Sequence, residues 1–237
     1  AGEALNPEVF KQFKKATGLK IFEGFGQTET TLSIANLNGT PIKIGAMGKP
    51  TPLYDIDVVD PDGRSVADGE TGEIVVHTEN GAPCGLFLGY YNNEDATNEV
   101  YHDGLYHTGD TAWRDEDGYL WYVGRVDDVI KSSGYRIGPF EIENVLMKHP
   151  AVLECAVTGI PDTSRGQAIK ATVKLADGFE KSKQLEKEIK RFVNKKVSSY
   201  KHIQVYIPPR EHHLHGVLAP RSRCFSATLY GVEHHPL

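Results

Sequence analysis

Residues 124–143, with the sequence GRVDDVIKSSGYRIGPFEIE, separate two parts of the chain that differ in character. Short β-type runs precede Gly124, whereas helix-like and strand-like segments alternate after it. Within the stretch, Arg125 and Arg136 supply fixed positive charge, which suits ribose or phosphate oxygens. Gly134 allows a bound chain to pass close to the backbone. The stretch therefore predicts a domain boundary that also carries ligand-binding groups.

The segment before this boundary, residues 45–124, is predicted to be an antiparallel β subdomain. Its apolar runs are short, as in YDIDVV, GEIVVHT and YLWYVG. Asp-Gly pairs separate the runs and favour tight turns, because glycine tolerates a positive φ. These pairs are Asp62-Gly63, Asp68-Gly69, Asp103-Gly104 and Asp117-Gly118.

Residues 125–201 are predicted to form a small α+β domain. The expected elements are a helix at 139–149, strands at 151–160 and 168–175, and a helix at 181–197. The last helix carries one apolar stripe at the 3.6-residue spacing, formed by Leu185, Ile189, Phe192 and Val193. Its many lysines lie on the other side, which we interpret as a solvated face and not as a nucleic-acid surface.

Residues 1–44 are predicted to be the edge of an α/β subdomain. The chain opens without Met on a helix-like segment, which indicates a piece of a longer protein; Pro7 suits the first helical turn and Gly18 the C-terminal cap. A short strand is expected at GLKIFEGFG (18–26), and QTETTLSIAN (27–36) has the polar opening of a second helix. The apolar residues that this edge should expose are Leu19, Ile21 and Leu32.

Residues 202–237 are predicted to be an irregular or frame-shifted tail. They hold six of the ten histidines, with Glu211 and Glu233 as the acidic residues, and they show no helix or strand period. A metal cluster of His212, His213 and His215 is the alternative, but zinc ligation needs a rigid frame that this stretch does not supply. Disorder or a wrong reading frame is the stronger interpretation.

The composition excludes several classes of function. The 237 residues include 26 Lys and Arg against 32 Asp and Glu, and the net charge of −6 argues against nucleic-acid or anionic-membrane binding. No apolar run approaches the ~18 residues of a membrane span, and a signal peptide is absent, which predicts a cytoplasmic protein. Cys84, Cys155 and Cys224 lie far apart, so neither a disulfide framework nor a zinc site is expected.

Two further motifs carry groups that suit a nucleotide, EGFGQTET (23–30) and YHTGD (106–110). In the first, Phe25 offers a stacking face for a base, Thr28 a hydroxyl for a phosphate, and Glu29 a hard oxygen for Mg²⁺. In the second, Asp110 can accept hydrogen bonds from a ribose diol.

Each of these residues also has an ordinary structural explanation. Thr28 suits a helix N-cap, Asp110 a turn cap, and Arg125 a surface ion pair. The three motifs together favour a nucleotide site. His102 and His107 are given no catalytic role, because neither has an evident carboxylate partner in the sequence.

In this order, the three motifs resemble the C-terminal part of the adenylate-forming superfamily, which comprises AMP-dependent acyl-CoA synthetases, adenylation domains of peptide synthetases, and luciferases. The resemblance covers residues 1–201, and GYYNNEDATNEVYHDGLYHTGDTAW (89–113) is most similar to the acetyl and medium-chain acyl-CoA synthetases. It implies a fold of three parts: an α/β edge, an antiparallel β subdomain and a small α+β lid. It also implies a ligation in which a carboxylic acid attacks ATP to give acyl-AMP, and CoA then displaces AMP.

The resemblance implies a role for each matched residue. Gly24, Phe25 and Gly26 would contact the nucleotide around adenine; Gln27 and Thr28 would lie beside the phosphate; Glu29 would hold Mg²⁺; Asp110 and Arg125 would hold the ribose; Arg136 would reach phosphate or CoA; Asp127 would be the hinge; and Ser133 and Gly134 would line the pantetheine path of CoA.

One position bears on the size of the acyl group. Acetate-specific members of the superfamily carry a tryptophan where this chain has Gly26, and that indole closes the acyl pocket. Its removal should open space for several methylenes, each contributing about 0.8 kcal/mol when buried. A medium-chain acyl substrate is therefore expected.

The chain also departs from the family pattern. The phosphate loop should lie upstream of residue 1, and no Pro-Lys-Thr-x-x-Gly-Lys segment follows Tyr200. We therefore expect the polypeptide alone to be unable to form acyl-AMP. Two alternatives remain open: a non-catalytic nucleotide- or CoA-binding module derived from this fold, and an adenylation domain that loads a carrier protein.

Overall fold

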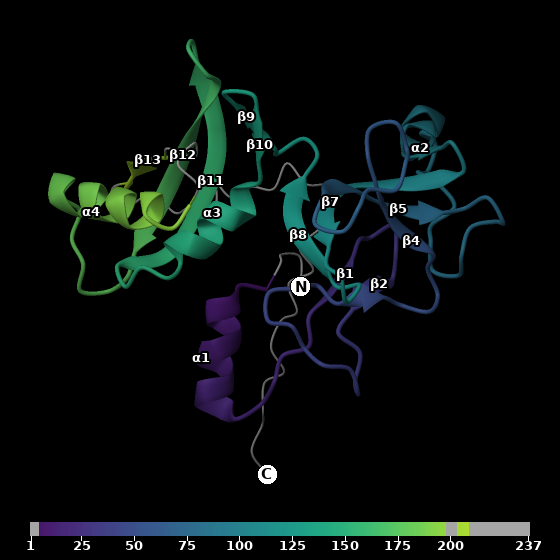
Figure 1. Cartoon of the computed structure of the whole chain (residues 1–237), viewed down its shortest axis with the longest axis horizontal. Helices are drawn as coiled ribbons and strands as arrows, with labels where there is room; N and C mark the ends of the chain where they lie inside the picture. Colours follow the sequence, from purple (N-terminus) through teal and green to yellow (C-terminus); the bar gives the residue numbers. More distant parts are fainter. Residues whose placement is uncertain (1–4, 198–202, 209–237) are drawn as a thin grey trace.

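The computed structural model describes residues 5–197 and 203–208, which form two bodies lying side by side (Figure 1). We call residues 5–125 the N-terminal unit, and the described residues from Ile130 onward the C-terminal unit. The boundaries proposed from the sequence stay predictions. None of the helices in the described ranges is long and apolar enough to cross a membrane.

The first helix, α1 (Pro7–Thr17), lies where the sequence predicts it. The Asn6 side chain caps its N-terminus by accepting the N–H of Glu8, and Gly18, with a φ of 74°, closes its C-terminus. Phe10 is the buried residue of this helix, whereas Val9 and Phe13 remain exposed. One apolar side of α1 therefore lies open to solvent.

The segment after α1 departs from its prediction. β1 (Gly24–Gly26), β2 (Leu32–Ala35) and β3 (Lys49–Pro50) form a small antiparallel sheet, so residues 27–36 contain a strand and not the start of a helix. Ile34 of β2 is fully buried in the same apolar cluster as Ile74 and Leu120. This tertiary packing outweighs the local polar pattern, because strand formation depends strongly on burial context.

The β subdomain predicted before Gly124 is a five-stranded antiparallel sheet. Its strand order is β4-β5-β7-β6, and β8 pairs with β7 as well. The glycines of all four Asp-Gly pairs have a positive φ, which confirms the predicted turns. A short helix, α2, precedes β6 and was not predicted. The bounds are β4 (Ile56–Val59), β5 (Thr71–His77), α2 (Glu94–Val100), β6 (Tyr101–His102), β7 (Leu105–Arg114) and β8 (Leu120–Arg125).

Both tryptophans of the chain lie on β7 and β8. Trp113 and Trp121 are direct cross-strand partners, with ring centroids 5.3 Å apart and an interplanar angle of 6°. The indole nitrogen of Trp121 donates a hydrogen bond to Asp115 at 3.0 Å. The two rings thus form a parallel stack on the strand pair that also carries Asp110 and Arg125.

The C-terminal unit is a second five-stranded sheet covered by two helices. Its strand order is β10-β9-β12-β11, and β13 pairs in parallel with β12. The predicted helices and strands at 139–197 are confirmed, although α3 ends earlier than expected. The bounds are β9 (Ile130–Ser132), β10 (Tyr135–Ile137), α3 (Pro139–Leu146), β11 (Val152–Asp162), β12 (Gly166–Leu175), α4 (Lys183–Asn194) and β13 (Ile203–Tyr206).

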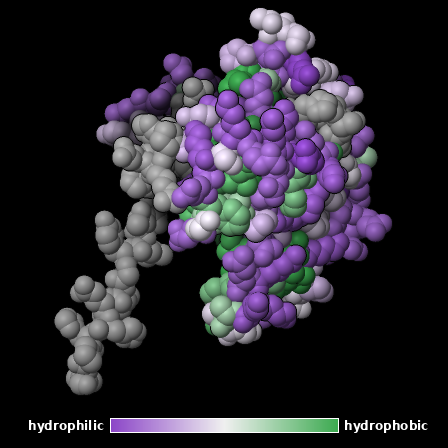
Figure 2. Space-filling model, turned by 90° about the vertical axis from the view of Figure 1, so that its left-hand side faces the viewer, coloured by the Kyte–Doolittle hydropathy of each residue, from purple (hydrophilic) through white to green (hydrophobic). Residues whose placement is uncertain are grey.

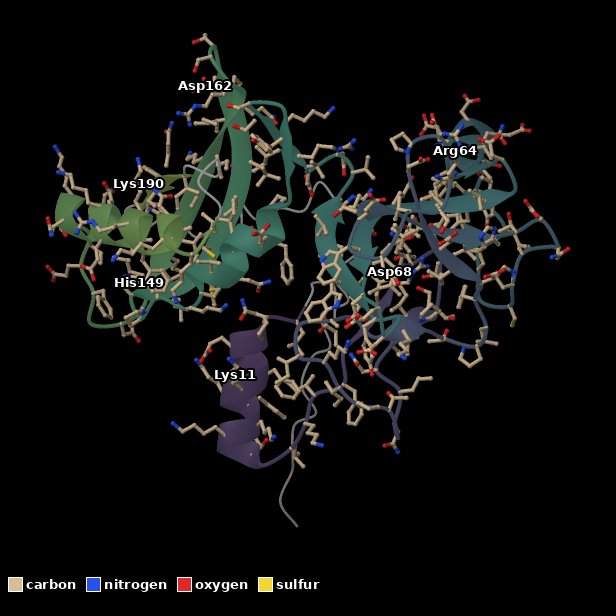
Figure 3. The ribbon with its side chains drawn as sticks, in the orientation of Figure 1. Lys11, Arg64, Asp68, His149, Asp162 and Lys190 are labelled. Atoms are coloured by element: carbon tan, nitrogen blue, oxygen red, sulfur yellow. The ribbon has the colours of Figure 1, made fainter. Side chains whose placement is uncertain are left out.

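The predicted stripe of α4 packs into one large apolar cluster between helices and sheet. Leu185, Ile189 and Val193 are buried there, and Phe192 packs against the same cluster. The opposite side of α4 is solvated, as the exposed Lys190 illustrates (Figure 3). The face that carries this unit is mostly hydrophilic (Figure 2). The amphipathic interpretation of this helix is therefore confirmed.

Part of the segment that was predicted to be irregular forms a strand. Residues 203–206 form β13 and pair with residues 169–172 of β12, and Ile203 and Ile207 are buried in the core of the C-terminal unit. The sequence did not reveal this strand, because a four-residue run gives too short a period to recognise. His212, His213, His215 and Cys224 lie outside the described residues.

The two units meet along β8 and α3. Phe140 of α3 packs edge-on against Tyr122 of β8, with ring centroids 5.7 Å apart. The Asn6 side chain before α1 donates a hydrogen bond to Asn144 of α3 at 3.0 Å. The C-terminal unit thus packs against β8, the strand that ends at Arg125.

Candidate functional site

Gln27 links the first motif to the second. It follows β1, and its side-chain amide donates to the Thr108 carbonyl at 2.8 Å and to the Asp110 carboxylate at 2.6 Å. Its amide oxygen accepts the hydroxyl hydrogen of Tyr106 at 2.9 Å. Both polar atoms of the Gln27 amide therefore bond to residues of β7, and the side chain fixes one motif against the other.

Asp110 lies at the centre of this arrangement. Its side chain is 7% exposed, and burial raises the pKa of the carboxyl to about 6, against the opposing effect of Arg125. Besides Gln27, the Tyr122 hydroxyl donates to the carboxylate at 3.1 Å, and the Arg125 guanidinium lies 3.7 Å away. These donors hold the carboxylate in one orientation, as a pair of ligand hydroxyls requires.

Arg125 and Asp127 extend the site toward the C-terminal unit. Arg125 ends β8 directly opposite Asp110 in the β7–β8 register. Its Nε donates to the exposed Asp127 at 3.1 Å. A continuous chain of contacts therefore joins Gln27, Asp110, Arg125 and Asp127, four residues selected from the sequence.

Glu29 is held at both ends by the loop before α2. Its backbone carbonyl accepts the N–H of Phe87 at 2.7 Å, and its carboxylate accepts the Tyr90 hydroxyl at 2.8 Å. Thr28 beside it is exposed. The described residues contain no group of three His, Cys, Asp or Glu side chains able to hold a metal. A single carboxylate nevertheless suits Mg²⁺, which is usually bound through one or two carboxylates together with substrate phosphates.

Close packing constrains both glycines of β1, and it constrains Gly26 more strongly because the neighbouring atom is backbone. A Cβ at Gly24 would lie 2.5 Å from a Leu32 methyl, and a Cβ at Gly26 would lie 2.4 Å from the Thr31 carbonyl oxygen. Phe25 between them is half-buried against the cluster that contains Ile34. A side chain at position 26 therefore demands a different backbone path, so the size of the acyl pocket does not follow from the Gly26 substitution alone.

The remaining predicted residues lie on the β9–β10 hairpin of the C-terminal unit. Ser133 and Gly134 form its two-residue turn with φ values of 51° and 82°, which is typical of a type I′ turn. Arg136 on β10 is exposed, opposite Lys131. Within the described residues, no hydrogen bond or ion pair joins Ser133, Gly134 or Arg136 to the cluster around Asp110.

Three tyrosines of this site were not predicted, namely Tyr90, Tyr106 and Tyr122. Tyr106 had a usable signal, because residues 106, 108 and 110 of one strand share a face. Tyr90 and Tyr122 reach their partners through the tertiary fold alone.

Both histidines have a carboxylate partner, contrary to the prediction. His107 lies 3.0 Å from the Glu73 carboxylate and His102 lies 2.9 Å from that of Asp103, and the two rings stack with centroids 3.8 Å apart. Glu73 also accepts the N–H of Gly109. These contacts stabilise β7 just before Asp110. The absence of a catalytic role for the two histidines stays a prediction.

A hollow of about 220 Å³ lies beside β1 and β2. Its lining includes Phe22, Leu32 and Leu37, all exposed apolar residues, together with Glu23. Burial raises the pKa of Glu23 to about 7, although its carboxylate accepts the N–H of Leu5 at 2.7 Å. Gly24 of the first motif also lines this hollow, whereas Glu29 and Asp110 do not.

Comparison with known proteins identifies two matching family models. Residues 1–91 match the model of the AMP-binding enzyme family, and residues 141–209 match that of the AMP-binding enzyme C-terminal domain. The second match extends beyond Lys201, in agreement with β13. The match includes residues just after Lys201, where a change of reading frame was predicted, and such a change stays a prediction.

Curated relatives match most of this chain but only part of their own length. The chain is 46% identical to the mitochondrial acyl-coenzyme A synthetase ACSM3 of Rattus norvegicus over 204 residues, which are 85% of this chain and 35% of that protein. It is 48% identical to 4-hydroxybutyrate–CoA ligase 1 of Metallosphaera sedula over 202 residues, 85% of this chain and 36% of that protein. The chain thus spans about a third of the length of these relatives.

Solved structures share the arrangement. The anthranilate CoA ligase AuaEII in complex with anthranoyl-AMP is 34% identical with a TM-score of 0.78, covering 89% of this chain and 40% of that one. The ATP-bound RpMatB-BxBclM chimera B1 is 30% identical with a TM-score of 0.79, covering 88% and 41%. These likenesses confirm the fold class predicted from the sequence.

Proposed function

Because the chain belongs to the AMP-binding enzyme family, we propose that it is the C-terminal part of an AMP-forming acyl-CoA ligase. The complete enzyme would join a carboxylic acid to ATP, forming acyl-AMP and pyrophosphate, and would then transfer the acyl group to the thiol of CoA with release of AMP. AMP is a far better leaving group than oxide, which is why the acid must be activated first. The contact chain from Gln27 to Asp127 carries this proposal.

The geometry supports a division of labour within the nucleotide site. Asp110 and Arg125 would hold the ribose, since a buried, oriented carboxylate accepts from a diol and the adjacent guanidinium donates to its oxygens. We assign Gln27 to holding Asp110 and not to the phosphate, because its amide is already bonded to β7. Gly24 and Phe25 would frame adenine, Thr28 would face the phosphate, and Glu29 would hold the Mg²⁺ that neutralises phosphate charge.

The hairpin residues would serve the second step. Ser133 and Gly134 would line the path of the pantetheine arm, and the exposed Arg136 would meet phosphate groups. Asp127, at the junction between the units and in contact with Arg125, would be the hinge about which the C-terminal unit turns between the two steps. Localisation in the cytoplasm and a medium-chain acid remain part of the proposal.

The upstream part of the enzyme would cover the exposed apolar side of the N-terminal unit. This part would also supply the phosphate loop, so the chain alone should not make acyl-AMP. The test uses the complete chain alone and the complete chain fused behind the N-terminal two thirds of the rat relative. Supplied with butyryl-adenylate and CoA, the fusion should form butyryl-CoA, as measured by chromatography, and D110A should reduce the rate by at least about 100-fold.

The controls separate the alternatives. The chain alone, given ATP and butyrate, should show no pyrophosphate exchange; exchange would contradict the requirement for an upstream part. A fusion that binds AMP in a calorimetric titration but forms no butyryl-CoA would favour the non-catalytic binding module. Transfer to the pantetheine of a carrier protein in preference to CoA would favour the carrier-loading adenylation domain.

A further inference from the structure

The loop before α2 runs along the first motif and contacts it repeatedly. Gly85 accepts the N–H of Thr31 at 3.1 Å, and Phe87 donates its N–H to the Glu29 carbonyl at 2.7 Å. Tyr90, further along the loop, donates its hydroxyl to Oε1 of Glu29 at 2.8 Å. The backbone and the carboxylate of Glu29 are therefore both set by this one loop.

Tyr90 is itself fixed from behind. Its N–H donates to the Thr97 hydroxyl of α2 at 2.9 Å. Gly89 has a φ of 143°, and a Cβ there would lie 2.9 Å from the Thr97 methyl, so the loop must pass this close to α2. The Tyr90 ring also packs edge-on against Phe87, with centroids 4.8 Å apart. Helix α2 thus fixes the backbone that carries the Tyr90 side chain.

The hydroxyl leaves the two carboxylate oxygens of Glu29 unequal. Oε1 accepts from Tyr90, whereas Oε2 has no hydrogen-bond donor among the residues that the structure describes. A hard cation such as Mg²⁺ binds a carboxylate oxygen best when that oxygen is preoriented and carries no competing donor. Resting on the function proposed above, we propose that Tyr90 is a positioning residue that orients Glu29 so that Oε2 receives the Mg²⁺ of the nucleotide.

Tyr101 provides a matched comparison within the same aromatic cluster. Its ring stacks on Phe87 with centroids 5.5 Å apart, but its hydroxyl donates to the Phe87 carbonyl and not to the motif. Replacement of either tyrosine by phenylalanine removes one half-buried hydroxyl from the same cluster. A purely structural contribution predicts similar effects of Y90F and Y101F, whereas positioning of Glu29 predicts an effect of Y90F alone on metal binding.

The experiment measures metal binding directly. The fusion of the complete chain is titrated with Mn²⁺ in the presence of ATP, and free Mn²⁺ is followed by electron paramagnetic resonance. Y90F should weaken Mn²⁺ binding about 10-fold, the low end of the range for removing a partner that orients a metal ligand. Y101F should stay within about twofold of the parent, and E29Q should lose more affinity than Y90F. ATP binding in EDTA should be equal in all four proteins.

The outcomes separate this inference from the proposed function. Mn²⁺ binding by Y90F equal to that of the parent, with E29Q impaired, would overturn the role of Tyr90 and leave the function standing. Equal losses in Y90F and Y101F would show a structural effect and would also overturn it. A parent fusion that binds no Mn²⁺ with ATP would remove the proposed function and this inference with it.

Discussion

The two units of the chain bury their apolar residues to different degrees. In the C-terminal unit, one cluster takes in residues from both helices and from β11, β12 and β13. In the N-terminal unit the clusters are smaller, and Leu19 and Leu32 are 63% and 49% exposed, as predicted, whereas Ile21 is half-buried. A unit with a closed core can fold by itself, whereas exposed apolar surface of this kind marks a surface that another part of a protein covers.

The largest expected effect on stability follows from truncating a side chain in the closed core of the C-terminal unit. Ile189→Ala should lower the free energy of unfolding of the C-terminal unit by about 2–5 kcal/mol, because Ile189 is fully buried. Leu32→Ala is a similar truncation at the exposed edge of the N-terminal unit. It should change the free energy of unfolding of that unit by less than about 0.5 kcal/mol. Hydrogen exchange in β11 and β12 against β5 and β7 would locate the change. Equal exchange increases in both sheets would show that the units unfold together.

The pH dependence of the N-terminal unit gives the next effect. The folded pKa of Asp110, about 6, lies above the ordinary 3.8, so the folded state binds this proton more tightly than the unfolded state. Stability should therefore fall as the pH rises from about 4 to about 6, by on the order of 3 kcal/mol. D110N should remove this slope in urea unfolding, leaving the part due to Glu23, which extends to about pH 7. A slope unchanged by D110N would contradict the assignment.

The C-terminal unit should respond to pH with the opposite sign. Burial lowers the pKa of His149, which lies after α3, against the opposing charge of Glu188 on α4 (Figure 3). The unfolded state then binds the proton more tightly, so stability should be lost as the pH falls through the ordinary histidine pKa of 6.5. His149→Gln should abolish this loss. Hydrogen exchange of α3 and α4 at decreasing pH measures it, and unchanged acid lability in the variant would refute it.

The smallest effect on stability should come with a clear effect on association. The double variant Leu19→Ser, Leu32→Ser removes two exposed apolar side chains of the N-terminal unit. The free energy of unfolding should therefore change by less than about 0.5 kcal/mol per site. Self-association in sedimentation experiments should nevertheless decrease, because two copies of the chain can bury these exposed apolar side chains against each other. Equal association of parent and variant would place the adhesive surface elsewhere.

Local sequence signals predicted those elements whose cause is local. The caps of α1, the Asp-Gly turns and the stripe of α4 each follow from residues within a few positions of one another. The helix predicted to begin within residues 27–36 is wrong, because Ile34 lies in a strand that is held by contacts with residues far along the chain. Strand β13 was not predicted, because a run of four residues is too short to show a period.

The candidate site shows the same division. The sequence selected Gln27, Asp110, Arg125 and Asp127, and the structure brings them into one chain of contacts. Sequence order could not indicate that Gln27 bonds to Asp110, 83 positions away, or that Tyr90 bonds to Glu29, 61 positions away. The tertiary fold decides which distant hydroxyl groups donate hydrogen bonds to the site, so no local sequence pattern predicts them.

The stacked tryptophans make the N-terminal unit the optically visible half of the molecule. Because the sequence contains no other tryptophan, tryptophan emission and any exciton coupling between indole rings originate on β7 and β8. Unfolding of the C-terminal unit alone would leave that signal almost unchanged. When the two units unfold separately, a fluorescence trace would therefore record the transition of the N-terminal unit alone, and a second label in the C-terminal unit is needed to observe the other.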